Sequence, residues 1–334
     1  MAPRFILVEG PDGGGKTRLC LDAFPTFNYQ HNGPPPFADP AGIFDWQLAE
    51  LLPKNPLHDT IVDRSWPSDQ IYHRFRAGGV NVFDRLSHRM FERWMFSVGG
   101  VIVMCLPPFD VAYRAWRARV VAGQELLTAD SQFAEMYAFY VNWPATNLRV
   151  INFDYTEDRD YQDLQFELDD DHERYEFVAN PAPGLLVGNP DARILVVSAR
   201  NKARRFPFVG YDEESRWLTM QFERLELDEA DLAWTNVRTP SGAVMPYDFL
   251  SKMPSIRTII ALGPEATGWA NNVANIHTII DAPDPAYARR QPDPDRVFVL
   301  GGGRVGLVPA DATALGFPSG DDWIEVFNRK DLLL

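Results

Sequence analysis

Short apolar runs alternate with longer, helix-like stretches along the first 156 residues. The apolar runs cover residues 5–9, 60–63, 101–106 and 149–153, and each has the length of a buried strand. Stretches with helical character lie between them, at 16–24, 43–52, 70–77, 83–97, 111–122 and 131–143. Strands that alternate with helices predict an α/β fold, a parallel sheet with helices on both faces. The proline-rich segment 33–40 predicts an exposed loop.

A second α/β pattern occupies residues 184–334. Strand-like runs at 192–199, 234–237 and 258–263 alternate with helix-like stretches at 213–225 and from 264 onward. A chain of 334 residues is also long for a single hydrophobic core. We therefore expect two domains, and in the first we expect ligands at the carboxyl ends of the strands.

The acidic charge is concentrated between these two regions. The formal net charge is −14, of which −8 falls within residues 157–183, including three consecutive aspartates at 169–171. This segment ends in Asn-Pro-Ala-Pro, a sequence typical of a connection rather than of a helix or strand. We predict an acidic linker at 157–183 between a domain at 1–156 and a domain at 184–334. An interaction tail or a mimic of a DNA backbone is the alternative.

The first strand candidate leads directly into a glycine-rich motif. Residues 10–17 read Gly10-Pro11-Asp12-Gly13-Gly14-Gly15-Lys16-Thr17, the G-x-x-x-x-G-K-T pattern of a phosphate-binding P-loop. Glycines let successive backbone N–H groups face a phosphate, and the helix that follows directs its positive N-terminus there. We expect this loop to bind ATP, with Lys16 at the outer phosphates and the Thr17 hydroxyl on Mg²⁺. The alternative is a glycine-rich turn before a helix.

Two features of the sequence indicate the cellular compartment. Its only cysteines, Cys20 and Cys105, lie in apolar segments, which indicates a reducing compartment and no disulfide framework. No apolar run approaches the roughly 18 residues of a membrane span, and the chain enters its first strand without a signal peptide. We expect a cytoplasmic protein without a membrane partner, in the host cytoplasm if it is viral.

The second strand candidate ends in an acid–arginine pair. Asp63-Arg64 is followed by a helix start that contains serine and tyrosine. Together with the P-loop, this arrangement resembles the thymidylate kinase and deoxynucleoside kinase group of P-loop kinases over residues 4–156. The resemblance implies that Asp63 accepts or orients the acceptor proton and that Arg64 neutralises charge on the transferring group. A structural ion pair at the end of the strand is the alternative.

The helix candidate at 111–122 carries Arg114, Arg117 and Arg119. In the resembled kinases, a mobile lid that bears arginines closes over the donor phosphates at this place. Arg114 and Arg117 share one helical face, so we assign both to ATP binding. Arginines solvated on an amphipathic helix are the alternative.

Several short motifs in residues 184–334 occur in the order typical of another family. They are Pro207-Phe208-Val209-Gly210, Thr235-Asn236-Val237, Ala261-Leu262-Gly263 and a late loop at Asp284-Pro285. This order resembles the uracil-DNA glycosylase superfamily and implies a three-layer α/β domain. By that resemblance, Phe208 stacks on a flipped pyrimidine and Asn236 hydrogen-bonds its uracil-type edge.

The same region departs from that family at two catalytic positions. The loop that carries a water-directing acid in the family is replaced by the basic stretch 198–205, and the histidine of the late loop is Asp284. An aspartate repels the negative charge that develops on a leaving uracil, so we predict no glycosylase activity. Arg289 and Arg290 are predicted contacts to DNA phosphates. A degenerate glycosylase fold that serves only as a scaffold is the alternative.

Three functions fit these observations. The first is a kinase that phosphorylates 5-hydroxymethyluracil in DNA, as in the bacteriophage 5-hydroxymethyluridine DNA kinases of thymidine hypermodification. The second is a thymidylate-like kinase of free deoxynucleoside monophosphates with an appended scaffold. The third is a DNA-binding or regulatory protein that binds ATP only as a ligand. A DNA reader in the same chain favours the first function, and the intact Lys16-Thr17 and Asp63-Arg64 pairs argue against the third.

Overall fold

The computed structural model divides the chain into two compact units. One contains Met1–Arg85 and Val98–Ala179, and the other contains Leu86–Ser97 and Asn180–Leu334. The structure describes residues 4–37, 39–51, 58–76, 83–143, 147–157, 161–175, 186–199, 207–238, 242–245, 250, 253–273 and 278–290.

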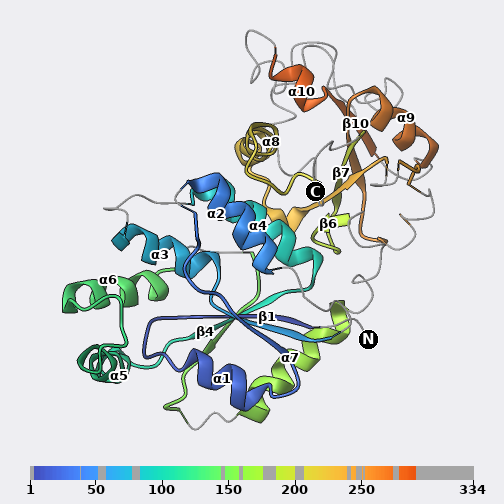
Figure 1. Cartoon of the computed structure of the whole chain (residues 1–334). Coiled ribbons are helices and arrows are strands. Elements are labelled where there is room, and N and C mark those ends of the chain that lie inside the picture. The colour runs from blue at the N-terminus through green and yellow to red at the C-terminus, as the bar shows by residue number, and fades with distance from the viewer. Residues whose placement is uncertain are drawn as a thin grey trace. The chain divides into compact units, whose positions relative to one another are not determined.

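The first unit is built on a five-stranded parallel sheet in the order β2-β3-β1-β4-β5 (Figure 1). Its strands are β1 (Phe5–Glu9), β2 (Asn28–His31), β3 (Thr60–Asp63), β4 (Val101–Cys105) and β5 (Val150–Phe153). β1, β3 and β4 are buried at every residue, as apolar runs in the middle of a parallel sheet require. The apolar pattern predicts four of these strands and misses β2, a polar strand at the edge of the sheet.

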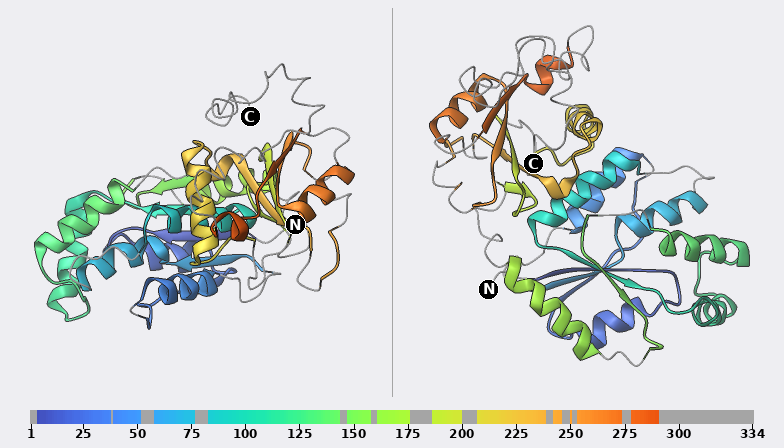
Figure 2. Two further views of the ribbon diagram at one scale, coloured as in Figure 1. Left: turned by 90° about the horizontal axis from the view of Figure 1, so that it is seen from above. Right: turned by 180° about the vertical axis from the view of Figure 1, so that it is seen from behind.

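Six helices accompany this sheet in the described part of the first unit: α1 (Lys16–Ala23), α2 (Pro40–Leu51), α3 (Trp66–Arg76), α5 (Phe109–Val121), α6 (Asp130–Val141) and α7 (Tyr161–Tyr175). Helices α1 and α7 lie side by side on one face of the sheet (Figure 1). Helices α5 and α6 pack through aromatic side chains, with the rings of Trp116 and Phe133 stacked at 4.7 Å, and form the green pair in Figure 2. The predicted α/β fold of this region is confirmed.

The segment 161–175 forms α7, so the predicted linker is wrong for these residues. Leu164 and Leu168 are buried in the core that includes Val8 and Leu19, and Tyr161 packs against that core. Leu164 and Leu168 are four residues apart and therefore occupy one helical face, which the surrounding acidic residues obscure in the sequence. Residues 158–160 and 176–183 of the predicted linker lie outside the described residues.

The second unit contains another five-stranded sheet, in the order β10-β9-β7-β8-β6, in which only β6 is antiparallel to its neighbour among the described pairings. Its strands are β6 (Leu186–Gly188), β7 (Ile194–Ser198), β8 (Leu232–Asn236), β9 (Thr258–Leu262) and β10 (Thr278–Ala282). Its helices are α4 (Arg85–Ser97), α8 (Glu213–Arg224), the 3₁₀ turn η1 (Glu229–Asp231), α9 (Pro264–Val273) and α10 (Pro285–Ala288). Within the described residues, no helix of either unit combines the length and apolar character needed to cross a membrane.

Helix α4 belongs to the second unit although it lies between β3 and β4 in the sequence. The reason is a buried charge network. Arg93 is fully buried, donates two 2.9 Å hydrogen bonds to the carboxylate of Glu229, and stacks 3.7 Å from the ring centroid of Trp234. Arg89 forms a second ion pair with Glu229 at 3.2 Å. The chain therefore passes from the first unit into the second and back before β4 begins.

Candidate active site

The P-loop joins β1 to α1 at the carboxyl edge of the first sheet. Gly10 and Gly13 have φ angles of 139° and 78°, which side-chain-bearing residues rarely adopt. A Cβ atom at Gly10 would collide with the carbonyl oxygen of Cys105, and one at Gly13 with the carbonyl oxygen of Ala112. The glycines thus allow the loop to lie directly against the end of β4 and against α5. The strand, loop and helix expected around this motif are confirmed.

Lys16 is turned back into the P-loop. Its ammonium donates to the carbonyl oxygens of Gly10 at 2.6 Å and Pro11 at 2.8 Å, and the residue is only 4% exposed. Burial, followed by the nearby charge of Arg64, lowers the pKa of Lys16. The two carbonyl oxygens hold the ammonium inside the loop, although burial and Arg64 both oppose its charge.

Asp63 and Thr17 connect β3 to the P-loop helix α1 through a side-chain hydrogen bond. The Thr17 hydroxyl donates to Asp63 Oδ2 at 2.6 Å, and Tyr29 and His31 approach the same oxygen at 3.1 and 3.3 Å. Burial alone would raise the pKa of Asp63, but the hydrogen bond from His31 and the charge of Lys16 lower it to about 2. Asp63 is therefore an anion at neutral pH.

The residues beside Thr17 fit a divalent cation. Asp63 Oδ1 is buried and has no hydrogen-bond partner among the described residues. A hydroxyl and a carboxylate supply the oxygen ligands that Mg²⁺ prefers. Asp63 does not line the neighbouring cavity, whereas Arg64 does. The structure thus separates two residues that the sequence placed together at the acceptor.

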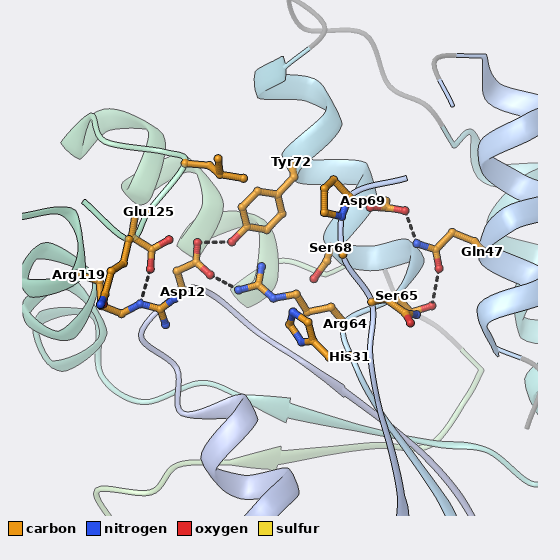
Figure 3. Close-up of a pocket in the computed structure, with 15 residues that line it drawn as sticks. Asp12, His31, Gln47, Arg64, Ser65, Ser68, Asp69, Tyr72, Arg119 and Glu125 are labelled. Atoms are coloured by element: carbon orange, nitrogen blue, oxygen red, sulfur yellow. Dashed lines mark hydrogen bonds and ion pairs between the residues drawn. The ribbon is translucent and has the colours of Figure 1, made fainter. Parts of the chain in front are cut away.

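A polar cavity of about 190 Å³ opens beside the P-loop (Figure 3). Its walls come from Asp12 of the P-loop, the last residue of β2 with residues 32–34 that follow it, helix α2, the β3–α3 segment with α3, and the end of α5 with the loop that follows. This volume is smaller than the roughly 300–1,000 Å³ of sites for drug-sized ligands. The cavity suits a compact, polar group.

One end of the cavity is an ion-paired cluster. Arg64 pairs with Asp12, and Tyr72 donates its hydroxyl to the same carboxylate (Figure 3). Burial opposes the charge on Asp12, but Arg64 and Lys16 outweigh that effect and lower its pKa. Arg64 itself has a φ angle of 76°, a left-handed conformation that costs a non-glycine residue about 1–3 kcal/mol. The strained backbone turns the guanidinium toward the cavity.

Glu9 supports this strained turn. Its carboxylate accepts a 2.6 Å hydrogen bond from the Ser65 N–H and a 2.7 Å hydrogen bond from the Ser68 hydroxyl. Glu9 is fully buried and directly precedes Gly10. Burial raises the pKa of Glu9 to about 7, despite the hydrogen bond from Ser68 and the charge of Lys16. This acid therefore couples the P-loop to the turn that carries Arg64.

The raised pKa of Glu9 predicts a pH-dependent stability. The folded protein binds a proton at Glu9 more readily than the unfolded chain does, so this residue makes stability fall as pH rises from about 4.5 to about 7. The shift corresponds to a loss on the order of 3 kcal/mol. In Glu9→Gln this contribution is absent, and the amide can still accept from Ser65. We expect the unfolding midpoint in urea to decline less with pH in Glu9→Gln than in the wild type.

Glu135→Gln is the matched control for this prediction, because it changes a 43% exposed glutamate of the same unit. Its pH profile should run parallel to that of the wild type between pH 5 and 8. If the profile of Glu9→Gln also runs parallel, burial does not hold a proton on Glu9.

The other end of the cavity is an oriented amide that the sequence analysis missed. Gln47 of α2 is 1% exposed, donates through Nε2 to Asp69, and accepts a 3.1 Å hydrogen bond from the Ser65 hydroxyl (Figure 3). These two contacts fix which end of the amide is the donor. No motif marks Gln47, because it is brought to Asp69 only by the packing of α2 against the start of α3.

Arg119 is the arginine of α5 that reaches the cavity. It pairs with Glu125 at 2.7 Å, and both residues line the cavity. Burial and the adjacent Asp12 raise the pKa of Glu125 to about 7. Arg114 pairs instead with Asp110 on the exposed surface at 2.9 Å.

Arg117 pairs with Asp130 at 3.5 Å and, like Arg114, does not line the cavity. Arg117 is half-exposed. The assignment of Arg114 and Arg117 to donor phosphates therefore stays a prediction that this structure does not test.

Phe208 is not available to stack on a base in this structure. It is 1% exposed, and its ring lies 5.6 Å from that of Trp234. Its carbonyl oxygen accepts a 2.6 Å hydrogen bond from Arg93, which fixes the backbone at a φ angle of 53°. The resemblance predicted an aromatic side chain that stacks on a flipped pyrimidine at this position. The structure instead shows a core residue of the second unit.

The other predicted DNA-binding residues are partly accessible. Asn236 ends β8, and its Oδ1 atom is buried without a hydrogen-bond partner among the described residues. Arg289 pairs with Glu213, and Arg290 is exposed. Asp284 caps α10 by accepting a 3.1 Å hydrogen bond from the Tyr287 N–H. Residues 200–205 of the basic stretch lie outside the described residues.

Comparisons with known proteins give only distant structural likenesses. No protein-family model and no curated protein matches the chain. The YorR protein from Bacillus subtilis, solved in complex with phosphorylated GDP, is 17% identical, with 51% of this chain and 98% of that chain covered and a TM-score of 0.40. Deoxyadenosine kinase from M. mycoides with bound dCTP is 14% identical, with coverages of 49% and 98% and a TM-score of 0.32. We draw no functional inference from likeness at this level.

Proposed function

We propose that the first unit is an ATP-dependent phosphotransferase that acts on a pyrimidine deoxynucleotide. The observation that carries this proposal is the 2.6 Å hydrogen bond from the Thr17 hydroxyl to Asp63 beside the P-loop, together with a polar cavity that Asp12 of the P-loop and Arg64 line. A phosphoryl transferase needs a donor site and an acceptor site that meet at the transferring group. The carboxyl edge of this parallel sheet offers both.

The donor side is formed by the P-loop. Backbone N–H groups of the loop and the N-terminus of α1 bind the phosphates of ATP, and Lys16 leaves its carbonyl partners to reach the outer phosphates. Thr17 and Asp63 would hold Mg²⁺, which neutralises phosphate charge when bound. We therefore assign Asp63 to the metal rather than to proton transfer, because its pKa of about 2 makes it a weak base.

The acceptor side is formed by the cavity. The acceptor oxygen attacks the γ-phosphorus, the bond from that phosphorus to the β–γ bridging oxygen breaks, and ADP leaves. The acceptor proton passes to the carboxylate pair of Asp12 and Glu125, of which Glu125, with a pKa of about 7, is the better base at neutral pH. Arg64 and Arg119 stabilise negative charge at this end of the cavity.

The acceptor we favour is the hydroxymethyl group of 5-hydroxymethyluracil in DNA. A second α/β unit in the same chain supports this choice, since a kinase of free nucleotides has no need of an appended nucleic-acid reader. Its Asn236 still offers an unpaired carboxamide oxygen. A free deoxynucleoside monophosphate is the second candidate, because Arg64 and Arg119 together can pair with the phosphate of such a nucleotide.

The metal assignment gives a direct test of Asp63. We expect Asp63→Asn to raise the Mg²⁺ concentration needed for half-maximal activity by at least about tenfold, because the anionic ligand is lost. The thermal stabilisation that Mg²⁺ adds in the presence of a non-hydrolysable ATP analogue should shrink in parallel. Asp59→Asn is the matched control, since Asp59 precedes the same strand and pairs with Arg4. An unchanged Mg²⁺ dependence in Asp63→Asn would remove Asp63 from the metal site.

The acceptor is tested by following the γ-phosphate of labelled ATP. One reaction contains a 5′-phosphorylated oligonucleotide with 5-hydroxymethyluracil, another contains the thymine oligonucleotide, and a third contains free dTMP and 5-hydroxymethyl-dUMP. Label on the first oligonucleotide alone supports the DNA kinase, and label only on the free nucleotides supports the second candidate. Label on none of them refutes the phosphotransferase proposal.

A further inference from the structure

Asn32 contributes to the cavity wall a carboxamide that has no hydrogen-bond partner among the described residues. The residue is only 5% exposed, and both its Nδ2 and its Oδ1 atoms are buried and unpaired. Its polar neighbours in the cavity differ in this respect, because Arg64 pairs with Asp12 and Gln47 is held by two partners. Asn32 is thus a buried polar group poised for a ligand.

The backbone fixes the direction of this carboxamide. The Asn32 N–H donates to the carbonyl oxygen of Asp63 at 3.1 Å, which continues the pairing of β2 with β3 past His31. Tyr29 and His31 both reach the Asp63 carboxylate. Because side chains alternate along a strand, Asn32 lies on the opposite face of the sheet. It is therefore directed away from the proposed metal ligand.

The face that Asn32 occupies is the one that carries the acceptor end of the site. Val8 is paired with Asp63 in the sheet, so the next residue, Glu9, shares the face of Asn32. From that face Glu9 accepts hydrogen bonds from Ser65 and Ser68, and Ser65 in turn donates to Gln47. Asn32 and Gln47 line the same cavity.

An unpaired buried carboxamide is costly in the free protein. Each unsatisfied group loses its hydrogen bonds to water without replacement, whereas an apolar side chain of the same shape has no such hydrogen bonds to lose. Buried polar groups are normally hydrogen-bonded, so an unpaired one needs a specific explanation. A ligand in the cavity that offers both a hydrogen-bond donor and an acceptor would supply the missing partners of Asn32.

We infer that Asn32 is a specificity-determining residue that hydrogen-bonds the acceptor base, an inference that rests on the proposed function. A carboxamide offers an N–H donor beside a carbonyl acceptor. The complementary ligand group is a carbonyl next to a ring N–H, the edge presented by a uracil-type pyrimidine. The oriented amide of Gln47 supplies a second point of recognition in the same cavity.

The variant Asn32→Leu separates a ligand-binding role from a structural one. Leucine is similar in size and needs no hydrogen bonds, so the melting temperature of the ligand-free protein should stay the same or rise. The KM for the pyrimidine acceptor should increase by about 5- to 150-fold, the range that corresponds to an unpaired group of 1–3 kcal/mol. The KM for ATP should not change. A structural asparagine would give the reverse, a lower melting temperature with an unaltered acceptor KM.

Asn28→Leu is the matched control, because Asn28 is the same residue type at the other end of β2, has an unpaired Nδ2, and does not line the cavity. It should leave the KM for the acceptor unchanged. Calorimetric titration with 5-hydroxymethyl-dUMP provides a readout that does not depend on catalysis. The wild type and Asn28→Leu should bind this nucleotide, and Asn32→Leu should bind it at least about fivefold more weakly.

The two proposals fail in different ways. Binding that depends on Asn32 without any phosphoryl transfer refutes the proposed function and leaves Asn32 as a ligand-binding residue. Transfer with equal acceptor KM in the wild type and Asn32→Leu refutes the role of Asn32 alone. Absence of nucleotide binding to the wild type overturns the inference as well.

Discussion

Substituting alanine for Lys16 is expected to lower the rate of phosphoryl transfer by about 10²–10³-fold, the usual cost of removing one charge-stabilising donor. Lys16 is 4% exposed, and its ammonium is held by the carbonyl oxygens of Gly10 and Pro11. In the proposed mechanism the ammonium leaves these partners and reaches the outer phosphates, where negative charge develops in a region shielded from water. The measurement is kcat for the acceptor proposed above, at saturating ATP.

The control for Lys16→Ala is Arg18→Ala. Arg18 is a cation two residues further along the same helix, but its side chain is 80% exposed and pairs with Asp22 on the surface. Its loss should change kcat by less than about twofold, since surface ion pairs contribute little. Full activity in Lys16→Ala would refute the P-loop assignment, provided that both variants keep the melting behaviour of the wild type.

Glu229→Gln should destabilise the second unit by about 3–5 kcal/mol, the cost of breaking a buried ion pair from one side. Glu229 is fully buried and is the counter-ion of both Arg89 and Arg93. Those two charges hold the pKa of Glu229 below its usual range although burial opposes this. The amide would leave two buried cations without a compensating charge. Denaturant unfolding, followed by the fluorescence of Trp234 and its neighbours, measures the loss.

The free energy of unfolding at acidic pH gives this prediction a second readout. A carboxylate with a lowered pKa stabilises the fold at neutral pH, and this stabilisation is lost as pH falls through the folded-state pKa. The difference in the free energy of unfolding between the wild type and Glu229→Gln should therefore become smaller at strongly acidic pH. Glu213→Gln is the matched control, because the side chain of Glu213 is 84% exposed in its pair with Arg289. This substitution should lower the free energy of unfolding by less than about 1 kcal/mol. A similarly small effect of Glu229→Gln would show that the network does not hold α4 in the second unit.

The loop that forms the proposed donor half of the site is predictable from the sequence because local features specify it. An apolar strand, glycines with positive φ angles and a Lys-Thr pair all lie within residues 5–17, so periodicity and turn chemistry together define the loop. The acid–arginine pair at the end of β3 is predictable for the same reason. The directions of its two side chains are not predictable from the sequence. The side chain of Asp63 faces Thr17, whereas Arg64 faces the cavity.

The cavity that forms the proposed acceptor half depends on contacts between distant segments. Asn32 follows a polar edge strand that has no apolar signature, and Gln47 becomes significant only because α2 places it beside Asp69. The domain boundaries are hidden in the same way. Helix α4 has the pattern of any amphipathic helix, and its place in the second unit follows from Arg93 meeting Glu229, a residue 136 positions later in the chain.

The most direct test of the central claim is to locate the transferred phosphoryl group by mass spectrometry. A 5′-phosphorylated oligonucleotide with a single 5-hydroxymethyluracil is incubated with the protein, ATP and Mg²⁺, and nucleases then digest it to nucleoside 5′-monophosphates without phosphatase treatment. The account predicts one additional phosphoryl group on the hydroxymethyl oxygen of the modified nucleotide, which forms about 10²–10³-fold more slowly when Lys16→Ala replaces the wild type. Phosphate only at an end of the strand, or consumption of ATP without phosphorylation of the modified nucleotide, would contradict it.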